Sequence, residues 1–297
     1  MKNVISSWKQ QYDPGSTGYY CMGSKASWFS FSAEGARHLG WNTMPADAAQ
    51  VRSLRLIPRP GHLKAGRLPV CLDEMKNLEY LQLPLTMFPD LVNRKISPKL
   101  KTLMMTNEAG YLKVMGNALV TPSMNWLALK ALIIHHSFGG DELNSFLGIR
   151  KEQMPALEYL SFYLDSYGHM LHNLAAFDTL KHIEISNAGR YNIAPYLHST
   201  LHSLHIAGAD QQFPVAELLR LTSLRALSFE DVSAEIDCRI FKFFPRLSEL
   251  RLIHCKKLTN EYALLDCRSL RQLHYEDCGE KLDHVLRKSQ MQLDKKN

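Results

Sequence analysis

The hydrophobic residues of this chain recur in a fixed pattern along most of its length. The pattern is LxxLxL, in which L is leucine or a similar apolar residue, and its ten matches start 27, 22, 29, 28, 23, 21, 23, 23 and 23 residues apart. They begin at Val51, Leu78, Leu100, Leu129, Leu157, Leu180, Leu201, Leu224, Leu247 and Leu270. Such spacing is the signature of a repeat protein, whose units bury their apolar edges by stacking on one another.

Each match predicts a short β-strand whose alternate side chains point inward and outward. The connecting segments carry helix signals, because Asp141, Pro214 and Asn260 each stand where a helix would begin. Stacked strands with helical or 3-10 returns predict an α/β solenoid. We expect a curved horseshoe with parallel strands on its concave face and the returns on its convex face.

The pattern resembles the repeat of the leucine-rich-repeat family over roughly residues 51–278. The last two matches, LSELRLIHC and LRQLHYEDC, resemble the cysteine-containing subclass of that family. The resemblance implies that Cys255 and Cys278 occupy inward, ladder-forming positions. Four earlier repeats depart from the Asn or Cys usual there, with Thr86, Glu108, Ser137 and Asp165.

The chain divides into three parts by this pattern. Residues 51–278 hold about ten repeats. Residues 1–50 contain no repeat but many aromatic residues, and we expect them to cap the open end of the solenoid; a separate binding module or a secretion-related leader are the alternatives. Residues 279–297 are polar and are expected to form a cap that continues as a loose tail.

The sequence carries no signal for export or membrane insertion. The first residues lack the apolar stretch of a secretory signal, and no apolar stretch is long enough to span a bilayer. Six cysteines form no CxxC pair, so reduced thiols are the simplest interpretation. We expect a protein of the cytoplasm, or one delivered to a host cytoplasm without a standard signal peptide, that is monomeric when free and binds no membrane.

Function in this architecture is expected on the outward side chains of the strands. Eight Lys or Arg and eight Asp or Glu occupy the outward positions, and this balance argues against a nucleic-acid groove. The charges are segregated, however: Lys181, Arg225 and Arg271 follow the leading edge of the late strands, and Glu230, Asp231, Glu276 and Asp277 follow the trailing edge. Such a field could orient a charged protein partner; the alternative is a simply solvated surface.

Apolar side chains are expected outward in the second to fifth repeats. They are Tyr80, Leu85, Met104, Ile133, Tyr159, Tyr163 and Leu164. Tyrosines beside aliphatic residues are typical of protein interfaces. The alternative is that the long connections between these repeats fold over them.

Seven of the thirteen histidines also map to the outward face: His135, His136, His182, His202, His205, His254 and His274. They favour a neutral polar surface, with binding that changes between about pH 5 and 7 as an alternative. A metal site at His254, between Asp231 and Asp277, is a third interpretation, but no closed ligand spacing supports it. We therefore predict no metal and no cofactor.

The candidate partner-binding residues combine these sets. They are Tyr80, Met104, Ile133, His135, Tyr159, Tyr163, Glu184, His205, Arg251 and His274.

No motif predicts an enzyme. The sequence has no Gly-rich phosphate loop, no GxSxG and no HExxH. Cys71 and Asp73 match the Cys-x-Asp of bacterial repeat-bearing ubiquitin ligases, but no room remains for the separate catalytic domain of that family.

We predict a non-catalytic module that binds a protein on its concave face. Three alternatives stay open: the substrate-recognition adaptor of a ubiquitin-ligase-like complex, an inhibitor or immunity protein for a toxin or enzyme, and a bacterial effector that targets a host protein.

Overall fold

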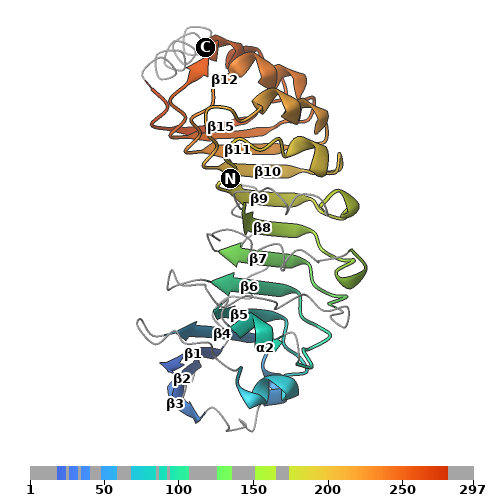
Figure 1. Ribbon diagram of the computed structural model, residues 1–297, viewed down its shortest axis with the longest axis vertical. Coiled ribbons are helices and arrows are strands. Elements are labelled where there is room, and N and C mark those ends of the chain that lie inside the picture. The colour runs from blue at the N-terminus through green and yellow to red at the C-terminus, as the bar shows by residue number, and fades with distance from the viewer. Residues whose placement is uncertain are drawn as a thin grey trace, which may run out of the picture. The chain divides into compact units, whose positions relative to one another are not determined.

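A computed structural model describes residues 19–24, 27–32, 35–40, 48–58, 68–84, 87–91, 94–106, 126–135, 151–164 and 174–279. The chain forms two compact units, Met1–Thr179 and Leu180–Asn297, called here the N-terminal and the C-terminal unit. In each unit short parallel strands pair one after the next (Figure 1). Each of the ten strands expected from the LxxLxL matches begins two residues after the start of its match.

The N-terminal unit contains five of the ten predicted strands. They are β4 (Ser53–Pro58), β5 (Tyr80–Pro84), β6 (Thr102–Thr106), β7 (Ala131–His135) and β8 (Tyr159–Tyr163). The register aligns Leu54, Leu81, Leu103, Leu132 and Leu160, one from each strand. These are the central leucines of the LxxLxL matches, so the sequence pattern sets the register.

Three further strands precede these repeats: β1 (Tyr19–Ser24), β2 (Ser27–Ser32) and β3 (Gly35–Gly40). They form an antiparallel meander, and β1 pairs in parallel with β4. An unpaired strand edge invites association with other chains. Here β1 occupies the edge of β4, which is the place where a cap is needed.

The C-terminal unit contains the other five predicted strands. They are β9 (His182–Ser186), β10 (Ser203–Ala207), β11 (Ala226–Glu230), β13 (Glu249–Ile253) and β15 (Gln272–Glu276), and they pair in that order. A small second ladder joins β12 (Ile236–Asp237) to β14 (Leu258–Thr259).

The inward side chains form the core of each unit. Leu204, Leu227 and Leu250 are at most 1% exposed. Phe229 of β11 contacts Phe241 of the return that follows, with ring centroids 6.5 Å apart. Packing of strand against return, repeated at the predicted spacing, confirms the leucine-rich-repeat solenoid.

The described returns are short and almost all 3-10. In the N-terminal unit they are η1 (Ala48–Gln50), η2 (Val70–Glu74), the four-residue α2 (Phe88–Leu91) and η5 (Lys151–Gln153). In the C-terminal unit they are η7 (Ala194–Tyr196), η8 (Val215–Arg220), η9 (Cys238–Phe243) and η10 (Glu261–Asp266). Most of the helix expected after Asp141 lies outside the described residues.

Two of the residues expected to begin a helix do precede one, but Asn260 does not cap its helix as expected. Pro214 directly precedes η8. Asn260 precedes η10 in a left-handed conformation and makes no side-chain cap; its Nδ2 instead donates to Oδ1 of Asp237, at 3.0 Å. Asp237 itself caps η9, because it accepts from the backbone N–H of Arg239 at 3.0 Å.

The five repeat strands of the C-terminal unit, β9, β10, β11, β13 and β15, are each followed by a left-handed residue and then by a buried one. The left-handed residues are Asn187, Gly208, Asp231, His254 and Asp277. Their successors are Ala188, Ala209, Val232, Cys255 and Cys278, all buried. The Cys255 Sγ lies 3.4 Å from the carbonyl of Ile253 and the Cys278 Sγ 3.2 Å from that of Leu252. Both thiols thus take the inward positions that the resemblance implied, while membership of the subclass stays a prediction.

Candidate protein-binding surface

The outward face of the C-terminal unit is built from two rows of side chains. The third position of each LxxLxL contributes His182, Ser203, Ala226, Glu249 and Gln272. The fifth position contributes Glu184, His205, Ser228, Arg251 and His274. Because parallel pairing is in register, each row runs straight across the strands.

The centre of this face is polar and closely packed. Ser228 is fully buried, and its hydroxyl lies 2.9 Å from Nδ1 of His205. The other ring nitrogen of His205 is 3.5 Å from a carboxylate oxygen of Glu230. Glu184 is buried, Arg251 is half-buried and His274 is exposed. Of the four predicted binding residues in this unit, His274 therefore offers the most open side chain.

A leading row runs along the start of the strands, formed by the second residue of each LxxLxL. In the C-terminal unit it consists of Lys181, His202, Arg225, Ser248 and Arg271. Backbone N–H groups of each member after the first donate to the carbonyl of the one before, at 2.7 to 2.9 Å. Arg225 and Arg271 are exposed. The row carries basic side chains and no acidic one.

Two histidines, His202 of this row and His182 beside it, have a lowered pKa. Burial lowers the pKa of His202, and the nearby cations of Arg225, Lys181 and Arg246 lower it further. Burial, with the charges of His202 and Lys181, lowers the pKa of His182 to about 3. Both shifts disfavour the charged ring, so the positive charge of this edge comes from lysine and arginine.

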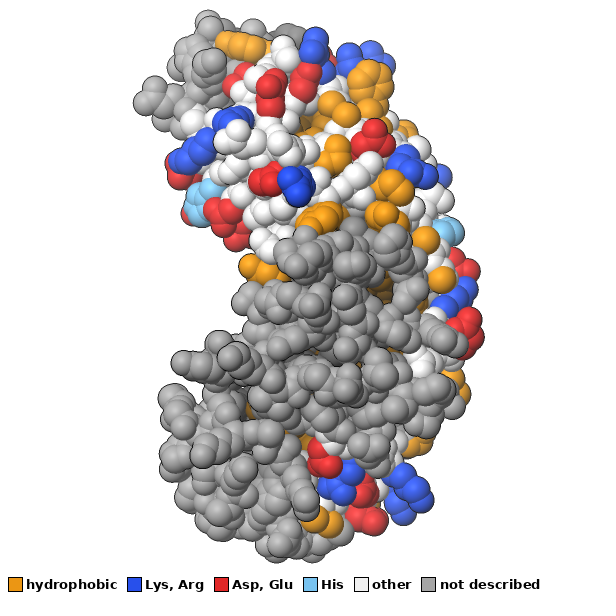
Figure 2. Space-filling model, in the orientation of Figure 1, with side chains coloured by type: hydrophobic (Ala, Val, Ile, Leu, Met, Phe, Trp, Pro, Cys, Tyr) orange, Lys and Arg blue, Asp and Glu red, His pale blue; other side chains and the backbone are white. Residues whose placement is uncertain are grey.

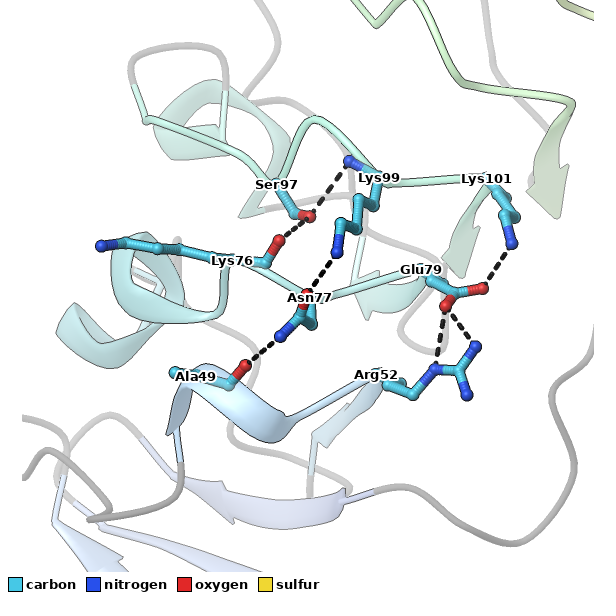
Figure 3. A network of polar contacts seen from close by, with 8 residues as sticks. All are labelled: Ala49, Arg52, Lys76, Asn77, Glu79, Ser97, Lys99 and Lys101. Atoms are coloured by element: carbon cyan, nitrogen blue, oxygen red, sulfur yellow. Dashed lines mark hydrogen bonds and ion pairs between the residues drawn. The ribbon is translucent and has the colours of Figure 1, made fainter.

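The same row of the N-terminal unit contains both cations and carboxylates, which pair with one another. Glu79 of the second repeat accepts hydrogen bonds from Nε of Arg52 at 2.8 Å and from Nζ of Lys101 at 2.6 Å (Figure 3). Lys130 lies 3.8 Å from Glu158 in the repeat that follows it. Side chains at this position therefore reach one another across neighbouring strands, and here cations pair with carboxylates.

Acidic residues follow the opposite, trailing edge of the C-terminal unit. Oδ1 of Asp231 lies 2.9 Å from Nδ1 of His254, and Oδ2 of Asp277 lies 2.5 Å from Nζ of Lys256. The Lys256 ammonium lowers the pKa of Asp277. Figure 2 shows histidine, basic and acidic side chains together along one border of this unit.

The proposed metal interpretation of His254 gains no support from this arrangement. His254 pairs with Asp231, whereas Asp277 is drawn to Lys256. Within the part of the chain that the structure describes, no three His, Cys, Asp or Glu side chains are placed to hold a metal ion.

The outward face of the N-terminal unit differs from the expectation. Tyr80 is 4% exposed, Tyr159 2% and Leu164 0%, so the prediction that these side chains are exposed is wrong. Tyr159 is buried with Ala131, and Ile133 packs against them. Tyr80, Tyr159 and Leu164 are thus buried within the unit. Most of the long connections that were the alternative cover lie outside the described residues.

The remaining predicted residues of this unit are partly accessible. Met104, Ile133 and Tyr163 are half-buried. The hydroxyl of Tyr80 lies 3.4 Å from the Met104 sulfur, and the Arg55 guanidinium lies 5.0 Å from the Tyr80 ring centroid. The side chain of His135 and all of Leu85 lie outside the described residues.

Some hydrophobic residues on the returns are exposed, and the sequence pattern does not predict this. Phe243 of η9 is 60% exposed, and Tyr262 and Leu265 of η10 are 55% and 47% exposed. The repeat pattern locates inward and outward strand positions but gives no phase for a 3-10 turn. No signal in a single sequence separates these positions from buried neighbours such as Phe241.

The Cys-x-Asp match has the environment of a structural thiol. Cys71 is buried, and burial raises its pKa. Asp73 pairs with Arg94, with Oδ2 and Nη1 3.1 Å apart. A reactive cysteine needs a lowered pKa and access to its substrate, and neither is present here.

No protein-family model matches the sequence, and no curated protein matches it. Among solved structures, the chain is similar to internalin C2 from Listeria monocytogenes, with 16% identity, 80% of this chain and 84% of that chain covered, and a TM-score of 0.39. It is also similar to the internalin inlF from the same organism, with 13% identity, coverage of 80% and 89%, and a TM-score of 0.39. The assignment of the fold rests on the strand order and register described above.

The described helices are all short. None of them is long and apolar enough to cross a membrane.

Proposed function

We propose that this chain is a non-catalytic binding module that holds a protein partner on the outward strand face of its C-terminal unit. The observation that carries the proposal is the layout of charge on that face. A basic leading row and an acidic trailing edge flank a polar centre. Side chains five to six residues apart along a strand are separated by about 20 Å, which is a span that a folded protein surface can cover.

The predicted binding residues of this unit lie inside that frame. Arg251 and His274 are adjacent in the fifth-position row, and His205 is two strands from Arg251. A partly exposed arginine whose neighbouring side chains are held in place is well suited to anchor a charged or hydrogen-bonding group of the partner. Charge segregation of this kind speeds the approach of a complementary partner and fixes its orientation.

A truncation experiment tests the proposal. Tagged wild-type protein is used for affinity capture with quantitative mass spectrometry, beside the double variant Arg251→Ala/His274→Ala. The control is Arg220→Ala/Arg268→Ala, which removes two exposed arginines in and after the returns η8 and η10. Melting curves show that each variant is folded.

The proposal expects a partner that the wild type and the control retain and the face variant loses. Equal capture by all three proteins, or loss with the control alone, would place binding elsewhere. The identity of the captured protein also separates the classes of module: a ligase scaffold indicates a substrate adaptor, and a single cognate enzyme or toxin indicates an inhibitor.

A further inference from the structure

Two buried cysteines of the C-terminal unit lie side by side in neighbouring repeats. The pairing of β13 with β15 aligns Ile253 with Glu276, and the backbone N–H of His254 continues it by donating to the carbonyl of Glu276 at 2.8 Å. Cys255 and Cys278 come next, each directly after a left-handed residue. The two cysteines therefore occupy equivalent positions of adjacent repeats, and both are buried.

The distance between these positions suits a covalent bond between the two sulfurs. Neighbouring strands lie about 4.8 Å apart, and a disulfide joins residues whose Cα atoms are about 4.4 to 6.8 Å apart. The Cys278 Sγ lies 3.2 Å from the carbonyl oxygen of Leu252, so it reaches across to the strand that leads into Cys255. A disulfide between the two cysteines therefore fits the existing strand register.

The two thiols also influence each other's ionisation. A hydrogen bond from the Cys255 side chain is the chief cause that lowers the pKa of Cys278, and the backbone N–H of Cys255 lowers it further, against the effect of burial. The same side-chain contact, together with burial, raises the pKa of Cys255. The negative charge of the pair is therefore held on the sulfur of Cys278. The thiolate is the form that reacts with oxidants.

Cys278 is also the more accessible of the two. It is 7% exposed, whereas Cys255 is fully buried. β15 is the last strand of the described sheet, and the exposed Gly279 follows Cys278 directly. A small oxidant is therefore expected to reach Cys278 first, while Cys255 meets the oxidised sulfur from inside the core.

Among the described residues, the other three buried thiols have a different setting. Burial raises the pKa of Cys71, Cys238 and Cys267. Cys238 begins η9 and Cys267 directly follows η10, so these two belong to the returns and not to the strand ends. The combination of a lowered pKa and a neighbouring thiol distinguishes Cys278 from all three.

We propose that Cys278 and Cys255 form a peroxide-sensitive pair, in which Cys278 is oxidised first and Cys255 then closes a disulfide between the two repeats. The Cys278 thiolate attacks one oxygen of hydrogen peroxide and the O–O bond breaks. The hydroxide that leaves takes up a proton to become water, and Cys278 is left as a sulfenic acid.

The second step consumes the sulfenic acid. The Cys255 sulfur attacks the sulfur of Cys278, the S–O bond breaks, and the departing hydroxide takes the proton of the Cys255 thiol to form water. The two sulfurs lose two electrons in total, and the peroxide is reduced to two molecules of water.

The disulfide ties the edge strand β15 to β13. Arg251 and His274 are aligned in the same register, each four residues before its cysteine. Oxidation therefore restrains the strand that carries His274. The chemistry needs no partner, so this inference goes beyond the proposed function and is tested without it.

Peptide mapping tests the inference on the full-length protein. Reduced protein is treated with hydrogen peroxide at pH 7, its remaining thiols are blocked with iodoacetamide in urea, and it is digested with trypsin. The expected product joins LIHCK (residues 252–256) to QLHYEDCGEK (residues 272–281) and is about 2 Da lighter than the two peptides together. Dithiothreitol should separate the two peptides again.

Single variants separate the roles of the two thiols. In Cys255→Ala, dimedone should trap roughly tenfold more sulfenic acid at Cys278 than in wild type, because no second thiol consumes it. In Cys278→Ala, peroxide should leave Cys255 unmodified. The matched control is Cys238→Ala, which removes a buried thiol outside the pair and should form the disulfide as wild type does. Melting curves show that each variant is folded, and the wild-type peptide map decides the pairing if one is not.

Hydrogen exchange reports the restraint on the strand. Amides of β15 should exchange roughly fivefold more slowly in oxidised than in reduced wild type, and Cys278→Ala should show no such change. Absence of the linked peptide, or linkage of Cys278 to Cys238 instead, would overturn the proposed pair. Equal dimedone labelling of the two cysteines would overturn the order of the steps, and unchanged exchange in the disulfide-linked protein would overturn the restraint.

Discussion

The carboxylate of Glu79 lies 2.6 Å from the ammonium of Lys101, one repeat further along the chain. Arg52 of the preceding repeat contacts the same carboxylate, so one acidic side chain links three successive repeats (Figure 3). The stability of a solenoid is the sum of the intrinsic stability of each repeat and the stability of the interfaces between neighbouring repeats. The contacts of Glu79 contribute to the interfaces.

Replacing Glu79 with glutamine should lower the stability of the N-terminal unit by up to about 1 kcal/mol, the range of exposed ion pairs. The hydrogen bond from Lys101 chiefly, and that from Arg52, lower the pKa of Glu79. The stabilisation is therefore present above the ordinary glutamate pKa of about 4.3 and is lost as the pH falls through the lowered value. Urea denaturation at pH 7 and pH 3 measures the difference between variant and wild type.

The control for this experiment is Glu152→Gln, an exposed carboxylate that makes no described ion pair. It should leave the urea midpoint unchanged at both pH values. A Glu79→Gln effect that was as large at pH 3 as at pH 7 would contradict an electrostatic origin.

The two tyrosines of β8 should respond differently to truncation. Tyr159 is buried with Ala131, whereas Tyr163 is half-buried. Removal of a buried aromatic ring leaves a cavity and costs about 3 kcal/mol or more, so Tyr159→Ala should unfold at lower urea and Tyr163→Ala should change little. Tyr159→Phe, which keeps the ring, serves as the matched control. Equal midpoints for Tyr159→Ala and wild type would show that the ring is not part of the core.

Three buried cysteines, Cys71, Cys238 and Cys267, should be unreactive in the folded protein. Burial raises the pKa of Cys238 to about 12 and also raises that of Cys71 and Cys267. Because the thiolate is the reactive form, iodoacetamide at pH 8 should label these residues only when urea is added, as peptide mass spectrometry can show. Rapid labelling of Cys71 in the native protein would revive its interpretation as a nucleophile.

The sequence was sufficient to predict the ten strands and their register. The leucines of each LxxLxL match can all face a shared core in only one register of the strands. The alignment of Leu54 with Leu81 and of Leu227 with Leu250 therefore follows from the pattern. The inward places of Cys255 and Cys278 were expected from the resemblance to the leucine-rich-repeat family, not from the leucine pattern itself. The 3-10 form of the returns and the cap at Asp237 depend on packing between repeats, which local propensity does not encode.

The sequence was a poorer guide to accessibility. Alternation correctly assigned Tyr159 to the outward side of its strand, but outward is not the same as exposed, because neighbouring side chains and connections can cover that face. In contrast, the charged edges were predicted correctly, since Arg225 and Asp231 lie where the strand begins and ends and remain exposed. The pairing of Asp277 with Lys256 depends on the course of a turn and had no counterpart in the pattern.

Replacing Leu160 with aspartate tests the inward assignment on which the whole fold depends. Leu160 is 4% exposed and lies in register with Leu132 of the neighbouring strand. A carboxylate at that place would have no partner among apolar side chains, and burying it would cost several kcal/mol. We expect loss of cooperative unfolding and rapid amide exchange in β7 and β8. Leu273→Asp is the comparison, because Leu273 of β15 is half-buried and its replacement leaves the charge partly solvated. A Leu160→Asp protein that stayed soluble and unfolded as cooperatively as wild type would refute the assignment of inward and outward faces.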